Sequence, residues 1–160
     1  MKILGNHIQI DLIKNLIEKM QFPNSLILSG QKGVGKALIA RNIAYCLVDC
    51  IKLDELNYIN ELTSHDILFI CKDNLEEKQQ SKQLMSRNDI SHISSFFKTK
   101  NVSDSKRVCI IDAIDDLSLD AINSLLKIIE EPNVNSHFIL ISHDNKKLLP
   151  TIKSRSFQIK

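Results

Sequence analysis

The sequence has no long apolar run and little net charge of either sign. In 160 residues, no stretch approaches the roughly 18 apolar residues of a membrane-spanning helix. The first residues lead at once into Gly5, Asn6 and His7, which excludes the apolar core of a secretory signal peptide. These absences predict a cytoplasmic protein with no membrane partner. The net charge of +2 is too small to indicate nucleic-acid binding by these residues alone.

The four cysteines lack the spacing of a zinc site. Cys46 and Cys50 are close together in a helical pattern, whereas Cys71 and Cys109 lie inside apolar, strand-like runs. Free thiols buried as small hydrophobic side chains explain this pattern better than a metal site does. We therefore predict no structural zinc and no other metal site.

The sequence also lacks internal repeats and low-complexity linkers, so we expect residues 1–160 to form one domain. Apolar runs that predict strands alternate with helical patterns, and a polar stretch at 73–88 predicts an exposed excursion whose order the sequence does not define. Alternation of this kind predicts an α/β fold with a mainly parallel, five-stranded sheet covered on both faces. The predicted strands are 25–29, 67–71, 107–112, 137–142 and 157–159, and the predicted helices are 8–20, 36–47, 90–97 (with Asp89 as N-cap), 119–129 (with Ser118 as N-cap) and a short turn or helix at 148–152.

A glycine-rich loop is the most informative feature that is present. From Gly30 to Lys36 the sequence is Gly-Gln-Lys-Gly-Val-Gly-Lys, the Gly-x-x-x-x-Gly-Lys spacing of a nucleotide-binding P-loop. In such a loop, backbone N–H groups of a segment containing Gly30, Gly33 and Gly35 would cradle phosphates together with Lys36. A predicted strand precedes the loop and a helical pattern follows it, which is the context that a P-loop requires.

Two positions that serve catalysis in P-loop ATPases are alanine in this sequence. Ala37 stands where a Ser or Thr hydroxyl binds Mg²⁺. Asp112 ends a predicted strand, where the metal-serving acid belongs, but Ala113 follows it where many such ATPases have a glutamate that polarises water. We interpret Asp115 and Asp116 as acids favoured by a helix N-terminus. We therefore expect no intrinsic hydrolysis, and at most weak binding of ATP or ADP.

Several longer segments resemble a known family. The Leu-Leu-Lys-x-x-Glu-Glu-Pro segment at 125–132 and the Ser-Arg-Ser segment at 154–156 are specific in combination. With residues 22–30, 64–67 and 111–113, they make the sequence similar to the clamp-loader branch of the AAA+ ATPases. Within that branch, the resemblance is to the delta-prime subunits of bacterial DNA polymerase III, and it covers nearly the whole chain.

This resemblance implies a three-layer, RecA-like P-loop NTPase fold and a role in DNA replication. It implies a non-catalytic, stator-like subunit that assists loading of a sliding clamp, within a holoenzyme whose own reaction is nucleotidyl transfer. The implied partners are other clamp-loader subunits, the sliding clamp and, through the assembly, primer–template DNA. Arg155 matches the arginine of the family's Ser-Arg-Cys motif, which stabilises the γ-phosphate of ATP bound by a neighbouring subunit. Ser156 replaces the family's cysteine, and we expect this change to leave the role of the arginine intact.

The sequence departs from the family in two further respects. Family members commonly have a four-cysteine zinc module after the P-loop helix, and only Cys46 and Cys50 fall in that region. Members also continue into a helical lid and a collar domain that drives pentamer assembly, and residues 1–160 include neither. We therefore expect either a fragment or a truncated gene product.

Two other functions stay open on the sequence alone. An active P-loop ATPase of the same family is opposed by the two alanines described above. A nucleotide sensor would bind ATP or ADP through Lys36 without turnover and with little dependence on Mg²⁺.

Ser142 and His143 end the fourth predicted strand, where active relatives carry a γ-phosphate sensor. Ser142 either senses the γ-phosphate weakly or simply ends the strand. Taken alone, Arg155 would be interpreted as a solvent-exposed loop residue. The preceding segment at 148–153 instead favours its interpretation as an arginine finger.

Overall fold

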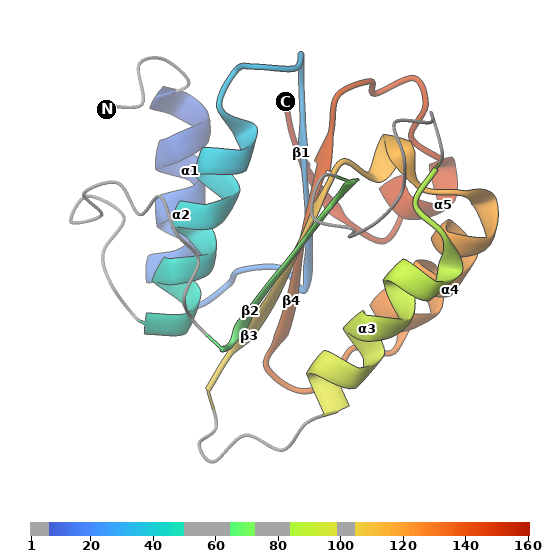
Figure 1. The fold of residues 1–160 in the computed structure, drawn as a ribbon. Coiled ribbons are helices and arrows are strands. Elements are labelled where there is room, and N and C mark those ends of the chain that lie inside the picture. The colour runs from blue at the N-terminus through green and yellow to red at the C-terminus, as the bar shows by residue number, and fades with distance from the viewer. Residues whose placement is uncertain (1–6, 50–64, 73–83, 99–104) are drawn as a thin grey trace.

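Five parallel strands form the centre of the molecule, and helices cover both faces of the sheet (Figure 1). The computed structural model describes residues 7–49, 65–72, 84–98 and 105–160. The strand order is β2-β3-β4-β1-β5, which confirms the predicted parallel sheet. The strands are β1 (Ser25–Ser29), β2 (Ile67–Cys71), β3 (Arg107–Asp112), β4 (Ser136–Ser142) and β5 (Phe157–Ile159). The helices are α1 (His7–Glu18), α2 (Lys36–Asp49), α3 (Arg87–Lys98), α4 (Leu119–Glu130), α5 (Pro150–Lys153) and the 3-10 helix η3 (Ile114–Asp116).

The sheet separates two hydrophobic cores because successive side chains of a strand point to opposite faces. Leu26 and Leu28 of β1 pack in the core that α1 and α2 cover, whereas Ile27 packs in the core that α3 and α4 cover. The same alternation in β3 and β4 explains why these strands are continuous apolar runs: both of their faces are buried. The predicted three-layer α/β sandwich is confirmed.

Helix α4 shows how local sequence fixes the ends of an element. The Ser118 hydroxyl accepts a hydrogen bond from the Ala121 N–H at 3.2 Å, so it is the N-cap that the sequence predicts. The helix ends at Glu130, two residues before Pro132. Leu119, expected on the apolar face, is instead 69% exposed, whereas Ala121 and Ile122 of the same turn are buried.

Two predictions near α3 are wrong. The helix begins at Arg87, so Asp89 lies in its first turn and is not its N-cap. The predicted exposed excursion includes Met85, which is only 1% exposed and pairs with Leu117 through backbone hydrogen bonds on both sides. The few apolar residues of this polar stretch follow no periodic pattern that would predict burial at Met85. Residues 73–83 of this stretch lie outside the described part of the chain.

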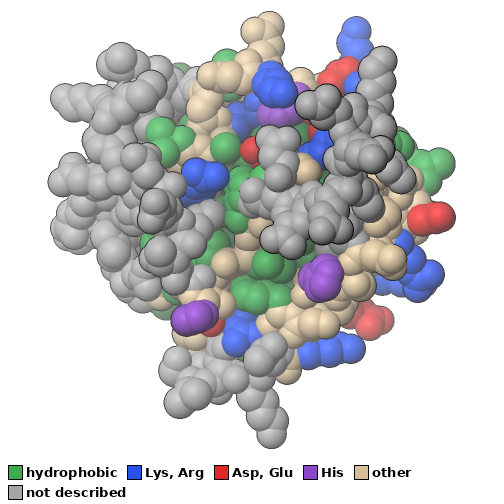
Figure 2. Space-filling view, viewed as in Figure 1, with side chains coloured by type: hydrophobic (Ala, Val, Ile, Leu, Met, Phe, Trp, Pro, Cys, Tyr) green, Lys and Arg blue, Asp and Glu red, His purple; other side chains and the backbone are tan. Residues whose placement is uncertain are grey.

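The visible surface carries no concentration of one charge. On the face shown in Figure 2, basic and acidic side chains are interspersed along the side formed by α3 and α4. Among the described residues, none of the helices is both long enough and apolar enough to cross a membrane.

Candidate functional site

The glycine-rich loop connects the carboxyl end of β1 to the start of α2, as the sequence predicts. Gly33 and Gly35 have φ angles of +90° and +89°, a region that side chains strongly disfavour. A Cβ atom on either residue would meet no heavy atom within 4 Å, so the backbone conformation, and not lack of space, requires glycine. Gly30 donates its N–H to the Ser142 carbonyl at 3.2 Å, which ties the loop to the end of β4.

Lys36 is folded over this loop. Its Nζ donates hydrogen bonds to the carbonyl oxygens of Gly30 at 2.7 Å and Gln31 at 2.6 Å, and the residue is only 7% exposed. Burial lowers the pKa of Lys36 below its ordinary value, and the negative charges of Asp112 and Asp115 oppose that shift. The charges of both carboxylates therefore act on the ammonium group, and an anionic ligand would compete with the loop carbonyls for it.

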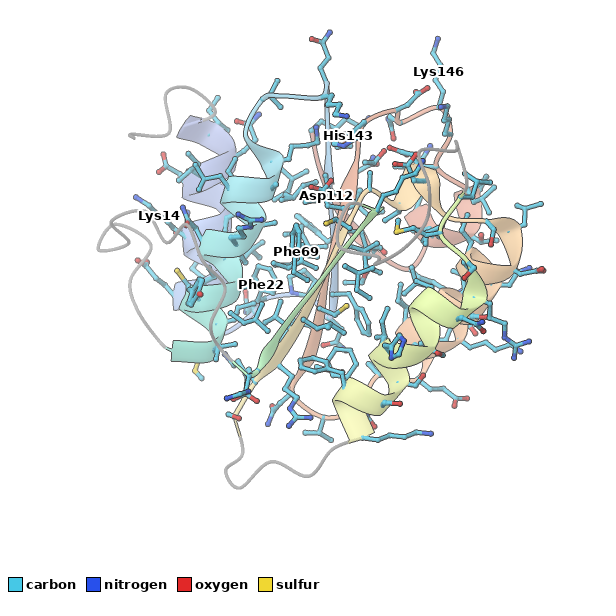
Figure 3. The ribbon with its side chains drawn as sticks, in the orientation of Figure 1. Lys14, Phe22, Phe69, Asp112, His143 and Lys146 are labelled. Carbon is cyan, nitrogen blue, oxygen red and sulfur yellow. The ribbon has the colours of Figure 1, made fainter. Side chains whose placement is uncertain are left out.

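Asp112 lies at the same end of the sheet as the loop because it is the last residue of β3, and parallel strands end together. It is in register with Cys71 of β2 and Ile141 of β4. The His143 Nε2 lies 3.4 Å from the Asp112 carboxylate, and Figure 3 shows the two side chains adjacent at the upper end of the sheet. The structure thus gathers the loop, Lys36 and Asp112, the arrangement typical of ligand sites outside the carboxyl ends of α/β strands.

Asp115 has a structural role that the sequence did not predict. Its carboxylate accepts hydrogen bonds from the Ser142 hydroxyl at 2.9 Å, from the Asp144 N–H at 3.2 Å and from the His143 N–H. These bonds join η3 to the end of β4, directly behind Asp112. An acid in the first turn of a short helix is interpreted by default as a favourable dipole contact. Nothing in the local sequence indicates that this carboxylate instead reaches across the chain.

The structure also shows what surrounds the two alanines at catalytic positions. Ala37 lies in the first turn of α2 and packs against the core under α1 and α2. Ala113 directly follows Asp112 and is 3% exposed. Neither side chain has an oxygen or nitrogen atom, so neither can bind a metal ion or activate water.

A cavity of about 250 Å³ lies beside the loop. Its walls come from α1, the loop and the end of β5, and they include Ile10, Ile13, Val34 and Ile159. Gln9 closes one side through a hydrogen bond from its amide to the Lys160 carbonyl at 3.0 Å. A mostly apolar cavity next to a phosphate-type loop has the shape and chemistry to accept the base of a nucleotide.

Arg155 lies near the amino ends of the neighbouring strands β1 and β5, whereas this loop follows the carboxyl end of β1. The Ser156 hydroxyl is 2.8 Å from the Ser25 hydroxyl at the start of β1, and Phe157 is in register with Leu26. The loop follows Ser29, four rises of about 3.3 Å farther along the same strand. The strand therefore separates Arg155 from its own chain's P-loop by roughly 13 Å of backbone.

The backbone that presents Arg155 is fixed, whereas its side chain is accessible. Ile152 of α5 is 1% exposed and anchors this short helix in the core under α3 and α4. The Arg155 side chain is 40% exposed, and its Nε lies 2.6 Å from the Glu130 carboxylate at the end of α4. Its Nη1 donates to the Thr151 carbonyl at 3.1 Å and to the Ser154 hydroxyl at 3.3 Å.

Metal binding has no support among the residues that the structure describes. No three of their His, Cys, Asp or Glu side chains form a group that could bind a metal ion. Cys46 and Cys109 are buried and Cys71 is partly buried, all as free thiols. Cys50 lies outside the described residues, so the absence of zinc stays a prediction.

Comparison with known proteins now identifies the family. A sequence model of the family described as DNA polymerase III, delta subunit, matches residues 5–160. The chain belongs to this family. It is 30% identical over 151 residues to DNA polymerase III subunit delta' of Bacillus subtilis, covering 90% of this chain and 44% of that protein. It is also 32% identical over 163 residues to DNA polymerase III subunit gamma of Buchnera aphidicola, covering 99% of this chain and 44% of that protein. The chain thus spans less than half the length of these relatives.

Solved structures of more distant proteins share the fold of this clamp-loader-branch chain. A DNA polymerase III gamma subunit-related protein of Thermotoga maritima superposes with a TM-score of 0.68 at 21% identity, over 94% of this chain and 45% of that one. The Holliday junction branch migration motor RuvB of the same organism gives a TM-score of 0.60 at 17% identity, over 97% of this chain and 44% of that one. The fold is that of the AAA+ P-loop proteins.

Proposed function

We propose that this chain is the AAA+ domain of a non-catalytic, delta-prime-type subunit of the DNA polymerase III clamp loader. In this role it would act as a stator that assists ATP-dependent loading of a sliding clamp onto primed DNA. It would complete the ATP site of a neighbouring subunit with Arg155. The family assignment supports the assembly, and the site geometry supports the division of labour within it.

The lack of an intact catalytic site supports the non-catalytic part of the proposal. Relatives named gamma and delta' match this chain about equally well, so similarity alone does not separate the two types. The chemistry favours the delta-prime type, because Ala37 offers no ligand for Mg²⁺ and Ala113 offers no base for water.

The position of Arg155 is the observation that carries the proposal. An arginine at the end of the strands opposite its own P-loop is poorly placed to serve that loop, but its side chain is exposed and could reach a neighbouring subunit. A planar, delocalised cation on a fixed backbone suits the negative charge that spreads over a γ-phosphoryl group in the transition state. The dispersed surface charge and the net charge of +2 favour DNA contact through the assembly and not through this domain alone.

The test is the DNA- and clamp-stimulated ATPase of a clamp loader reconstituted with the full-length form of the subunit that contains residues 1–160. Arg155→Ala should lower turnover at the neighbouring site by about 10³-fold, the lower end of an arginine finger's contribution. Arg155→Lys should restore little of it, because an ammonium lacks the planar fork. Lys147→Ala removes another exposed cation and serves as the matched control. Full turnover by the Arg155→Ala complex, with assembly intact, would refute the arginine-finger role.

A second candidate, a nucleotide sensor, is favoured by the cavity beside the loop and by Lys36 within it. Phosphate binding would replace the Lys36 contacts to Gly30 and Gln31, and the missing hydroxyl at Ala37 would make affinity nearly independent of Mg²⁺. Titration with a fluorescent ATP analogue, with Mg²⁺ and with EDTA, tests this function, and Lys36→Ala should abolish binding. Measurable ATP turnover by the isolated chain would instead indicate an active ATPase.

A further inference from the structure

An ion pair joins the two sequence segments that identify the family. The Arg155 Nε lies 2.6 Å from the Glu130 Oε1, within hydrogen-bond distance and shorter than most charge-assisted pairs. Glu130 is the last residue of α4, and Arg155 lies between α5 and β5. The two residues are 25 positions apart in the sequence, so the fold and not local chain geometry brings them together.

Glu130 occupies a place that its own helix disfavours. The C-terminus of a helix carries partial negative charge, and an acid there is destabilising. Glu131 follows it and adds a second negative charge beyond the helix end. The cation of Arg155 offsets this unfavourable placement, so the carboxylate and the guanidinium each determine where the other lies.

The ion pair is too exposed to contribute much to stability. The two side chains are 40% and 44% exposed, and ion pairs of this kind typically stabilise a protein very little. The ion pair has a larger effect on the orientation of the Arg155 side chain than on stability, because an unpaired arginine side chain samples many rotamers. The backbone is already fixed by the Arg155 N–H, which donates to the Ile152 carbonyl at 3.2 Å. Among the described residues, Glu130 is the charged partner of the guanidinium, whose Nη1 also donates to the Thr151 carbonyl and the Ser154 hydroxyl.

We propose that Glu130 is a positioning residue for Arg155, which it orients toward the nucleotide phosphates of a neighbouring subunit. This proposal rests on the arginine-finger function proposed above. Glu130 itself touches no nucleotide: it acts by reducing the number of rotamers that Arg155 samples before the subunits meet. Ordering one such side chain in advance is an effect of about ten-fold.

The experiment measures ATP turnover of the reconstituted clamp loader containing Glu130→Gln, with Glu131→Gln as the matched control. Both variants remove one negative charge near the end of α4, but only the first removes the partner of Arg155. We expect Glu130→Gln to lower kcat about ten-fold with the KM for ATP unchanged, and Glu130→Asp to restore part of the loss. Glu131→Gln should have wild-type turnover, and the melting temperatures of all variants should agree closely.

A double variant shows whether Glu130 acts through Arg155. In the Arg155→Ala background, Glu130→Gln should cause no further loss of turnover. Wild-type or increased kcat for Glu130→Gln, or a full second loss in the double variant, would overturn the positioning role while leaving the arginine finger intact. An Arg155→Ala complex with unchanged turnover would overturn both proposals, so the two failures are distinguishable.

Discussion

The hydrogen bonds of Asp115 give the sharpest stability prediction for this fold. Its carboxylate accepts from the Ser142 hydroxyl and from two backbone N–H groups at 143 and 144. Ser142 is fully buried, so Asp115→Ala leaves a buried hydroxyl without its acceptor, which costs about 1–3 kcal/mol. The two N–H groups are only partly buried, and water can replace part of what they lose. We expect a total loss of about 2–4 kcal/mol in the free energy of unfolding.

Urea unfolding of the purified chain, followed by circular dichroism, measures this loss. Asp116→Ala is the matched control, because Asp116 carries the same charge on the same 3-10 helix and its side chain makes no hydrogen bond with another described residue. We expect that variant to lose less than about 1 kcal/mol. For a loss of about 3 kcal/mol, a chain of this size should melt roughly 6–12 °C lower. Equal stability of the two variants, at an unchanged m-value, would refute the role assigned to Asp115.

Three further predictions concern single groups. Burial lowers the pKa of His137 below 6.5, so the folded state binds fewer protons than the unfolded state and the free energy of unfolding should fall as pH drops below about 6.5. His137→Asn should flatten this pH dependence, measured as the urea midpoint between pH 5 and 7; an unchanged slope of midpoint against pH would contradict this prediction. Burial raises the pKa of the Cys109 thiol, so this cysteine should react with a thiol reagent only on unfolding. Early modification of Cys109, detected by peptide mapping of the native chain, would contradict its buried position. Ala37→Ser should make nucleotide affinity depend on Mg²⁺ without producing hydrolysis, because Ala113 still supplies no base. ATP turnover by this variant would show that hydrolysis does not require the missing base.

The sequence predicts the elements of this fold well where one local signal determines them. The strands at 25–29, 67–71 and 107–112 have the predicted bounds because buried parallel strands are largely apolar runs. The strand at 157–159 also has the predicted bounds, although Phe157 is 42% exposed. Ser118 caps α4 as expected, since a side-chain oxygen before a helix meets a nearby N–H group in most contexts. The loop geometry at Gly33 and Gly35 likewise follows from spacing and flanking elements.

What the sequence does not predict depends on contacts between distant segments. The burial of Met85 results from its pairing with Leu117, and the role of Asp115 results from the approach of η3 to the end of β4. The ion pair between Glu130 and Arg155 is a third case, because neither residue indicates the other in sequence. Each of these contacts depends on how the strands are ordered in the sheet, and strand order is not a local property of the chain.

In the proposed function, this chain completes a neighbour's ATP site and does not complete its own. Single-turnover hydrolysis by the reconstituted clamp loader, mixed rapidly with clamp, primed DNA and ATP, tests it most directly. With Arg155→Ala in this chain, the account predicts that the amplitude of the fast phase falls by the equivalent of one ATP site, while assembly is unchanged. A fast phase of full amplitude would contradict the account.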